Sequence, residues 1–470
     1  MAIEKPMEPS DILLEEDDME SDLAIIVEDP ETLEVVMDDG SVVVQFGQNP
    51  FEDEVPTHDA NLAEHIEDNE LEHIASELVD HFQSDRESRG DWASAYIKGL
   101  DLLGMKVEDR TEPWNGASGV YHPMMTEAVI KFQAQAMGEL LPAAGPVRTK
   151  IMGKLTTEKY EQAQRVETEL NYLITEKMPD YRDEMEQMLF KLPMAGSAFK
   201  KIYFDPITER PVSQFVPAED LVVSYGASNL RTAPRFTHVM KKTSEEILKL
   251  QVNGFYRDVE LPEAVKDITD IEAKYNELEG SDVTFSDDPR HTILEMHVDL
   301  DLPEPFDDEN GVALPYVVTI DKSSSIVLAI RRNWYEDDAK REKRMHVVHY
   351  PYLPGMGFYG TGLIHTLGGL TKSATSIMRQ LIDAGTLSNL PAGFKARGMR
   401  ITGDNTPIMP GEFRDVDVAG GTIKDSIVPL PYKEPSGVLY SLLGNVVEEG
   451  RRVGAVGDIQ MKDVNAQAPV

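Results

Sequence analysis

The spacing of apolar residues predicts helices over a large part of the chain. Leu62, Ile66, Ile74 and Leu78 form an apolar stripe at helical spacing within residues 58–105. Further helices are predicted for the following segments: Thr126 to Leu141, Thr156 to Pro179, Tyr181 to Lys191, Thr361 to Ser388 and Ser436 to Arg452. In the second of these, the apolar stripe is made of Tyr160, Ala163, Val166, Leu170, Leu173 and Ile174.

Alternating or continuous apolar runs between turn signals predict strands in two other regions. Ala198 to Asp205 alternates and ends before Pro206, and Phe215 to Val223 indicates a strand that an exposed turn interrupts. Four more runs crowd into residues 292–350: Ile293 to Leu300, Tyr316 to Asp321, Ile326 to Arg331 and Met345 to Tyr350. The mixture predicts an α+β protein, and 470 residues predict several modules.

The net charge of −39 is unevenly distributed. Residues 1–80 hold 26 acidic residues against Lys5 alone, which gives −25, and the other 390 residues hold 58 acidic and 44 basic residues, which gives −14. Residues 1–55 are therefore interpreted as a solvated acidic arm. A body this acidic is unsuited to wrapping DNA by neutralising its phosphates.

Composition excludes several kinds of site. The chain has no cysteine, which excludes a disulfide framework, thiolate metal sites and a cysteine nucleophile. His58, His65, His73 and His81 recur beside carboxylates, but on one helix successive histidines either rotate apart or lie about 10 Å apart along the axis, so no metal site is predicted. No apolar run of about 18 residues suggests a membrane helix, and the acidic N-terminus does not resemble a secretory signal.

The glycine-rich segment before the long helix permits two opposite interpretations. Gly355, Gly357 and Gly360 fit the G-x-G-x-x-G pattern of dinucleotide-binding loops, a strand precedes them, and Asp383 follows at the distance expected for a ribose ligand. Against this, Pro351 and Pro354 separate the strand from the glycines. We therefore interpret Gly355, Gly357, Gly360 and Gly362 as a structural turn that lets a helix start sharply and pack closely. No cofactor is expected.

Three segments carry a family resemblance. Glu167 to Asp205 gives paired helices, a small-residue turn and a strand containing lysines, Val216 to Ile247 follows, and Phe358 to Pro391 holds the glycine turn and the long helix. In this order they resemble the portal proteins of short-tailed, double-stranded DNA bacteriophages, over roughly residues 85–455. The resemblance implies a portal fold with a helical wing and stem, a β-rich clip inserted between two stem helices, and the start of a helical crown.

On this sequence the resemblance implies eight regions. They are an acidic arm (1–55), wing (56–242), first stem region (243–270), clip (271–355), second stem or channel helix (356–388), tunnel-loop region (389–402), wing return (403–435) and start of the crown (436–470). Lys395, Arg397 and Arg400 would then lie near the constriction of the channel and hold DNA loosely, although ordinary surface charge also accounts for them.

The resemblance also implies partners and a location. The chain would form a head-to-tail homo-oligomeric ring, a dodecamer in the family, at one capsid vertex of the virion after assembly in the host cytoplasm. Double-stranded DNA would pass through the ring, which an acidic wall would not bind tightly. The ring would dock the terminase large subunit, a tail adaptor protein, and the major capsid and scaffolding proteins. No membrane partner is expected.

Two other classes of function stay open at this point. A nucleotide-binding enzyme would use Gly355, Gly357 and Gly360, but the chain has no P-loop, no G-x-S-x-G and no H-E-x-x-H motif. Glu295 and His297 share one strand face, where a satisfied surface pair is favoured over catalysis. An acidic, DNA-mimicking inhibitor would account for the first 80 residues but not for the structured remainder.

Overall fold

The computed structural model describes residues 25–29, 32–36, 42–46, 56–106, 108–205, 209–280, 289–303, 305–306, 311–389, 393–395, 400–401, 416–417, 427–429 and 432–466. The chain divides into two units, residues 1–60 and residues 61–470. In the first unit, three strands pair antiparallel in the order β1 (Ile25–Asp29), β2 (Thr32–Val36) and β3 (Val42–Phe46). The apolar patches of the acidic arm thus form a small sheet of their own.

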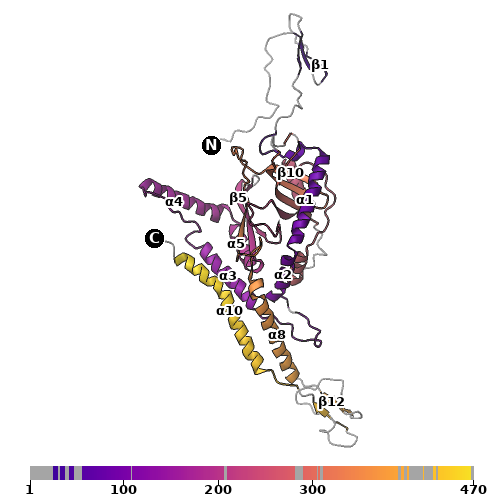
Figure 1. Cartoon of the computed structure of the whole chain (residues 1–470), viewed down its shortest axis with the longest axis vertical. Coiled ribbons are helices and arrows are strands. Elements are labelled where there is room, and N and C mark those ends of the chain that lie inside the picture. The colour runs from indigo at the N-terminus through magenta and orange to yellow at the C-terminus, as the bar shows by residue number, and fades with distance from the viewer. Residues whose placement is uncertain are drawn as a thin grey trace. The chain divides into compact units, whose positions relative to one another are not determined.

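The second unit begins with helices. They are η2 (Leu62–Glu64), α1 (Asp68–Ser88), α2 (Gly90–Leu100), η3 (Asp101–Leu103), α3 (Met124–Leu140), α4 (Thr157–Tyr172), the π-turn η4 (Leu173–Lys177) and α5 (Tyr181–Ala195) (Figure 1). Thr156 caps α4 by accepting a hydrogen bond from the Lys159 amide, as a threonine before a helix favours. Gly196 ends α5 with φ of +80°, a conformation that glycine adopts without strain.

Two antiparallel sheets follow. The larger has the order β10-β9-β8-β7-β6 and the smaller the order β11-β4-β5. The strands are β4 (Ser197–Asp205), β5 (Arg210–Pro217), β6 (Leu221–Val223), β7 (Arg235–Lys242), β8 (His291–Leu300), β9 (Leu314–Asp321), β10 (Ile326–Arg332) and β11 (Val347–Pro351), with α6 (Ser244–Val252) and α7 (Asp270–Glu279) between β7 and β8. The α+β class predicted from sequence is confirmed.

Helix α1 covers one face of the larger sheet. Its buried Leu71, Leu78 and Phe82 pack into one core with Leu294 and Val318 of the sheet. The predicted stripe of Leu62, Ile66, Ile74 and Leu78 lies in this core, although Leu62 and Ile66 precede α1. The core thus joins α1 to strands from more than 200 residues away in the chain. A second core joins α2, α3, the smaller sheet and the first turns of α8 (Leu363–Asn389).

The strands of the predicted β-rich insertion at 271–355 find pairing partners outside that block. β8 pairs along its length with β7, which lies before residue 271, and β11 pairs with β4 from Val347↔Lys201 to Pro351↔Ser197. Backbone N–H and C=O groups in a buried strand must find partners, and here the partners lie outside the block. The strands of this region therefore complete the sheets of the body.

The turn between β5 and β6 was expected to be exposed. In the structure, a buried arginine donates hydrogen bonds to its carbonyl oxygens. Arg89, 6% exposed at the junction of α1 and α2, donates from Nη1 to the carbonyl oxygens of Ala218 (2.7 Å) and Leu221 (3.1 Å) and from Nη2 to that of Glu219 (2.6 Å). It also donates to the Tyr359 hydroxyl at 3.0 Å. One guanidinium thus joins the helical layer, the β5–β6 turn and the glycine turn.

We expect Arg89→Met to lower the free energy of unfolding by about 3 kcal/mol, because buried carbonyls left without donors cost about 1–3 kcal/mol each. Urea denaturation followed by circular dichroism measures this. The matched control is Arg86→Met, an exposed position one turn earlier on α1, which should change stability by less than about 0.5 kcal/mol. Equal effects of the two substitutions would contradict the assigned role of Arg89.

Candidate functional site

The glycine turn is filled by the protein itself. A Cβ on Gly360 would lie 2.2 Å from the carbonyl oxygen of Gly196, and one on Gly362 would lie 2.3 Å from that of Met194. A Cβ on Gly355 would meet the carbonyl oxygen of Tyr359 at 1.9 Å. These glycines allow backbone to approach backbone where the turn meets the end of α5.

Gly357 and two backbone amides of the turn also contact other parts of the chain. A Cβ on Gly357 would lie 2.6 Å from the ring of Tyr225. The Gly360 amide donates to the Ser197 hydroxyl at 2.8 Å, and the Gly362 amide donates to His365 Nδ1 at 3.2 Å. A phosphate-binding loop presents free amides to its ligand, whereas these two amides already have partners within the chain.

The strand before the glycines also disagrees with a dinucleotide-binding fold. That fold requires a parallel strand feeding directly into the loop. β11 instead pairs antiparallel with β4, and every named strand pair among the described residues is antiparallel. Asp383 accepts a hydrogen bond from the Ser118 amide at 2.8 Å, so it anchors the segment before α3. The nucleotide-binding interpretation of Gly355, Gly357 and Gly360 therefore finds no support in the geometry.

Two long helices form an antiparallel hairpin. α8 and α10 (Gly437–Ala466) pack against each other, and α10 also contacts α3 (Figure 1). A Cβ on Gly385, late in α8, would lie 3.7 Å from Pro435, just before α10. A Cβ on Gly454, just past the middle of α10, would lie 3.7 Å from Leu367, early in α8. The hairpin is therefore closed at the end where residues 390–436 connect its helices.

The predicted DNA-contacting residues lie in that connection. Lys395 ends β12 (Gly393–Lys395) and pairs with Ile427 of β15 (Ile427–Pro429). Arg400 starts β13 (Arg400–Ile401), which pairs with β14 (Val416–Asp417). Arg397 lies outside the described residues. The structure thus places Lys395 and Arg400 on separate two-stranded ladders between the hairpin helices in sequence.

A buried polar cluster joins the two sheets, and sequence reasoning identified only part of it. Lys201 of β4 contacts Glu295 of β8 at 2.6 Å, and His297 Nε2 lies 3.1 Å from the same carboxylate. His238 of β7 faces Glu295 in the strand register, and the rings of His297 and His346 lie 5.9 Å apart. Lys201 beside Glu295 holds the pKa of the carboxyl well below its usual range. The pair thus ties the smaller sheet to the larger one.

The histidines of this cluster are held neutral. Burial lowers the pKa of His238 to about 3 and that of His346 to about 4, and it also lowers the pKa of His297. Charging any of them would place a cation in a desolvated site beside Lys201. Catalysis would need a reachable acid or base, whereas His238 and His297 are 4% and 1% exposed.

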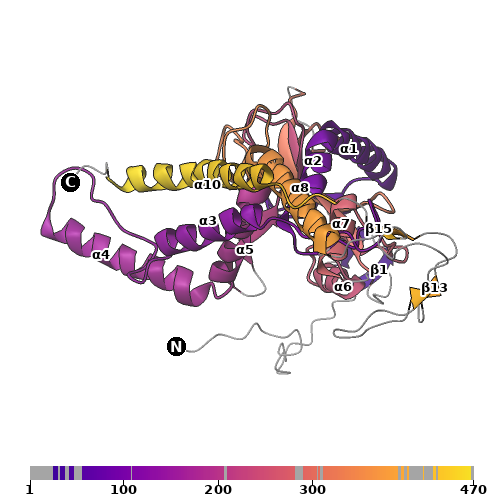
Figure 2. The same ribbon diagram turned by 90° about the horizontal axis from the view of Figure 1, so that it is seen from below.

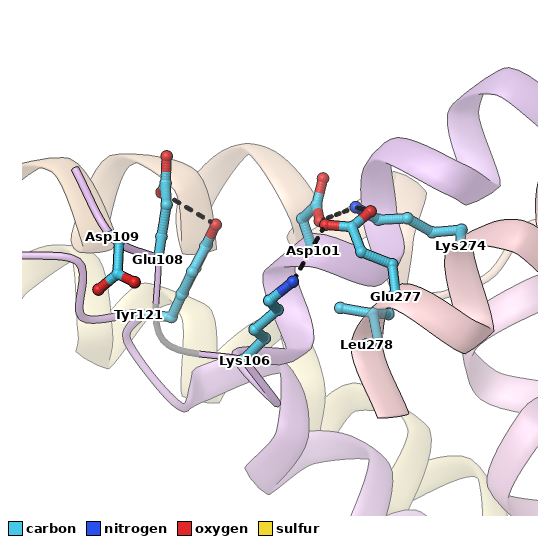
Figure 3. Close-up of a pocket in the computed structure, with 8 residues that line it drawn as sticks. All are labelled: Asp101, Lys106, Glu108, Asp109, Tyr121, Lys274, Glu277 and Leu278. Carbon is cyan, nitrogen blue, oxygen red and sulfur yellow. Dashed lines mark hydrogen bonds and ion pairs between the residues drawn. The ribbon is translucent and has the colours of Figure 1, made fainter. Parts of the chain in front are cut away.

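An open pocket of about 430 Å³ lies beside η3 and α7 (Figure 3). Its charged residues largely contact one another: Lys274 bonds Asp101 at 2.7 Å and Glu277 at 2.8 Å, and Tyr121 donates to Glu108 at 3.2 Å. Four carboxylates and two lysines line it, so the pocket is unsuited to a phosphate.

The described ranges hold neither a metal site nor a membrane-spanning helix. Within them, no three histidine or acidic side chains come together as metal ligands. Nor does any described helix combine the length and apolar character that a membrane span needs.

The body is an antiparallel α+β fold, its glycine turn serves close packing, and a hairpin of two long helices extends from it. Residues 146–450 match the family model described as phage SU10 portal protein. The chain belongs to this family of phage portal proteins. It therefore has the structural role of a portal at a capsid vertex, as the sequence resemblance predicted. A comparison with curated proteins finds no match.

We expect the body to lose stability between pH 6.5 and pH 4. Unfolding frees the buried histidines to bind protons at their ordinary pKa near 6.5, whereas the folded state cannot bind them until the pH approaches 4 or below. Each histidine kept neutral costs about 1.4 kcal/mol per pH unit in this window. Thermal melts at pH 7, 6, 5 and 4 measure the loss.

The matched variants are His346→Gln, within the cluster, and His73→Gln, at an exposed position of α1. His346→Gln should reduce the fall in melting temperature between pH 7 and pH 4, and His73→Gln should leave that fall unchanged. If both variants follow the wild-type pH profile, the acid sensitivity does not come from this cluster.

Proposed function

We propose that the chain forms a dodecameric ring at one capsid vertex of a short-tailed, double-stranded DNA phage, through which the genome is packaged and ejected. The observation that carries the proposal is the α8–α10 hairpin in a chain of the portal family. Portal subunits combine a wing with two stem helices that flank a clip. The antiparallel hairpin, with residues 390–436 connecting its helices, matches that plan.

The hairpin supports a revised division of the chain. We assign the sheets and helices from residue 61 to about residue 361 to the wing, α8 and α10 to the stem, and residues 390–436 to the clip. Residues 243–270 and 271–355, expected from sequence as first stem region and clip, then belong to the wing. The clip replaces the expected tunnel-loop region and wing return, and α10 becomes the second stem helix in place of the start of the crown.

The ring would act through binding rather than catalysis. Its partners would be the terminase large subunit and a tail adaptor protein at the clip end, and the major capsid and scaffolding proteins around the vertex. Assembly would take place in the host cytoplasm before the ring becomes part of the virion. The structural role of the family supports a function through binding, and the packed glycine turn offers no nucleotide site.

Lys395, Arg397 and Arg400 would contact DNA from the clip. They place three positive charges within six residues of a chain whose net charge is −39. Such a group would attract phosphates locally, while the acidic remainder lets the duplex pass.

Ring formation is the direct test of the proposal. The purified chain at micromolar concentration should elute as a particle of several hundred kilodaltons, and negative-stain images should show closed rings with a central pore. A chain of 52.5 kDa that elutes as a monomer under near-physiological salt would contradict the proposal.

The DNA contact is tested by neutralising the three basic residues together. Lys395→Gln, Arg397→Gln and Arg400→Gln should leave ring formation intact and lower the amount of DNA retained in packaged capsids by several-fold. The control neutralises Lys98, Arg231 and Lys249, which are exposed on the body and change the net charge equally. The same loss in both triple variants would show a general charge effect instead.

A further inference from the structure

Helix α4 is almost uncovered in the single subunit. None of its residues is buried, although its sequence carries an apolar stripe that predicts a packed face. The segment before α4 hydrogen-bonds to one side of the helix. Glu167 accepts hydrogen bonds from the amide and hydroxyl of Thr149, and Asn171 exchanges two hydrogen bonds with the backbone of Val147. We call residues 146–172 the α4 arm.

The α4 arm exposes a dense set of apolar side chains. Met152 is 81% exposed and Leu155 75%, and along the helix Tyr160, Val166 and Leu170 are 54%, 43% and 39% exposed. A lone helix of this length is marginal in water, because most helical stability comes from packing an apolar face. Exposed apolar side chains gathered on one segment are typical of a contact with another protein.

The charge of the α4 arm differs from that of the rest of the chain. The arm has five basic residues (Arg148, Lys150, Lys154, Lys159 and Arg165) and four acidic ones (Glu158, Glu161, Glu167 and Glu169), which gives +1 in a chain of −39. Three of its basic residues precede the helix, beside Met152 and Leu155. A surface both apolar and locally basic fits an acidic protein partner.

The chain itself offers such a surface on α1. Exposed carboxylates recur along one side of this helix at Glu70, Glu77, Asp80 and Glu87. Figures 1 and 2 show α4 and α1 on opposite sides of the body, with α5 and the sheets between them. A head-to-tail ring requires two different complementary surfaces on different sides of each subunit, and these two helices meet that requirement.

We infer that the α4 arm of one subunit docks on the α1 side of the neighbouring subunit in the ring. Val166 and Leu170 would supply the apolar contact, and Lys150 and Lys154 would face the carboxylates of Glu77 and Asp80. The inference rests on the proposed ring, and it adds which surfaces meet.

The absence of cysteine in the sequence allows a clean cross-linking test. A chain carrying both Val166→Cys and Glu77→Cys should give a ladder of covalent oligomers with a short bismaleimide, whereas each single variant should stay monomeric on a denaturing gel. The control combines Val166→Cys with Val252→Cys, at a position 79% exposed on α6, and should give no ladder. A dimer from Val166→Cys alone, or no ladder from the double variant, would overturn the inference.

A charge swap tests the same contact without cross-links. Lys150→Glu with Lys154→Glu should lower the fraction of chain in rings at low salt by at least several-fold. Adding Glu77→Lys and Asp80→Lys should restore it. Because all four side chains are exposed, circular dichroism should show the same fold in every variant. Failure of the second pair to restore assembly would overturn the pairing of these two surfaces.

The outcomes separate this inference from the proposed function. If the wild-type chain forms no rings, the proposed function fails. If rings form and also persist in Val166→Glu with Leu170→Glu, the ring stands and the α4 arm is not its contact. If the cysteine at position 166 links only to the capsid protein in assembled particles, the arm docks on the capsid and the inference is overturned.

Discussion

The second unit depends on the buried guanidinium of Arg89. It satisfies three carbonyl oxygens of the β5–β6 turn and the hydroxyl of Tyr359, and Trp92 stacks beside it. A turn that crosses under a helical layer would otherwise bury carbonyl groups without donors. Five donor N–H groups in a planar fork suit this task, and a lysine could not reach so many acceptors at once.

The glycine turn follows from the same arrangement. Tyr359 is fixed by Arg89 and by the Val223 amide at 3.1 Å, so the turn around it must run close to the end of α5. Only residues without a side chain allow the contacts between Gly360 and Gly196 and between Gly362 and Met194. The long helix α8 therefore leaves the body at a defined place.

The two sheets are joined by polar rather than apolar contacts. Lys201 and Glu295 form an ion pair between β4 and β8, surrounded by histidines that burial keeps neutral. Buried ion pairs add little net stability, but breaking one partner is strongly destabilising. The body thus has a polar cluster that fixes how its two sheets meet, while the α4 arm has an apolar surface that the single chain leaves exposed.

The sequence by itself determined the α+β class, many of the helices and strands and, through the order of its motifs, the portal family, whereas β7 and α7 were not predicted. The long helix after the glycines was predicted within about two residues of its observed ends, because its apolar period and the turn before it are local features. The glycines also gave a local signal, but that signal suited a phosphate loop as well as a packed turn. Only the antiparallel pairing of β11 with β4, and the backbone lying against Gly360, decided between the two.

The pairing of the strands could not be predicted from the sequence. Pairing joins residues that lie far apart in the chain, and the alternation of apolar and polar residues does not identify the neighbouring strand in the sheet. The block at 271–355 therefore looked self-contained, whereas its strands complete sheets begun at residues 197 and 221. The apolar stripe of α4 could be predicted from the sequence, but its exposure could not. The spacing of apolar residues identifies the apolar face of a helix and does not show what packs against that face. What covers a face is decided by tertiary structure and, for α4, we infer by the next subunit.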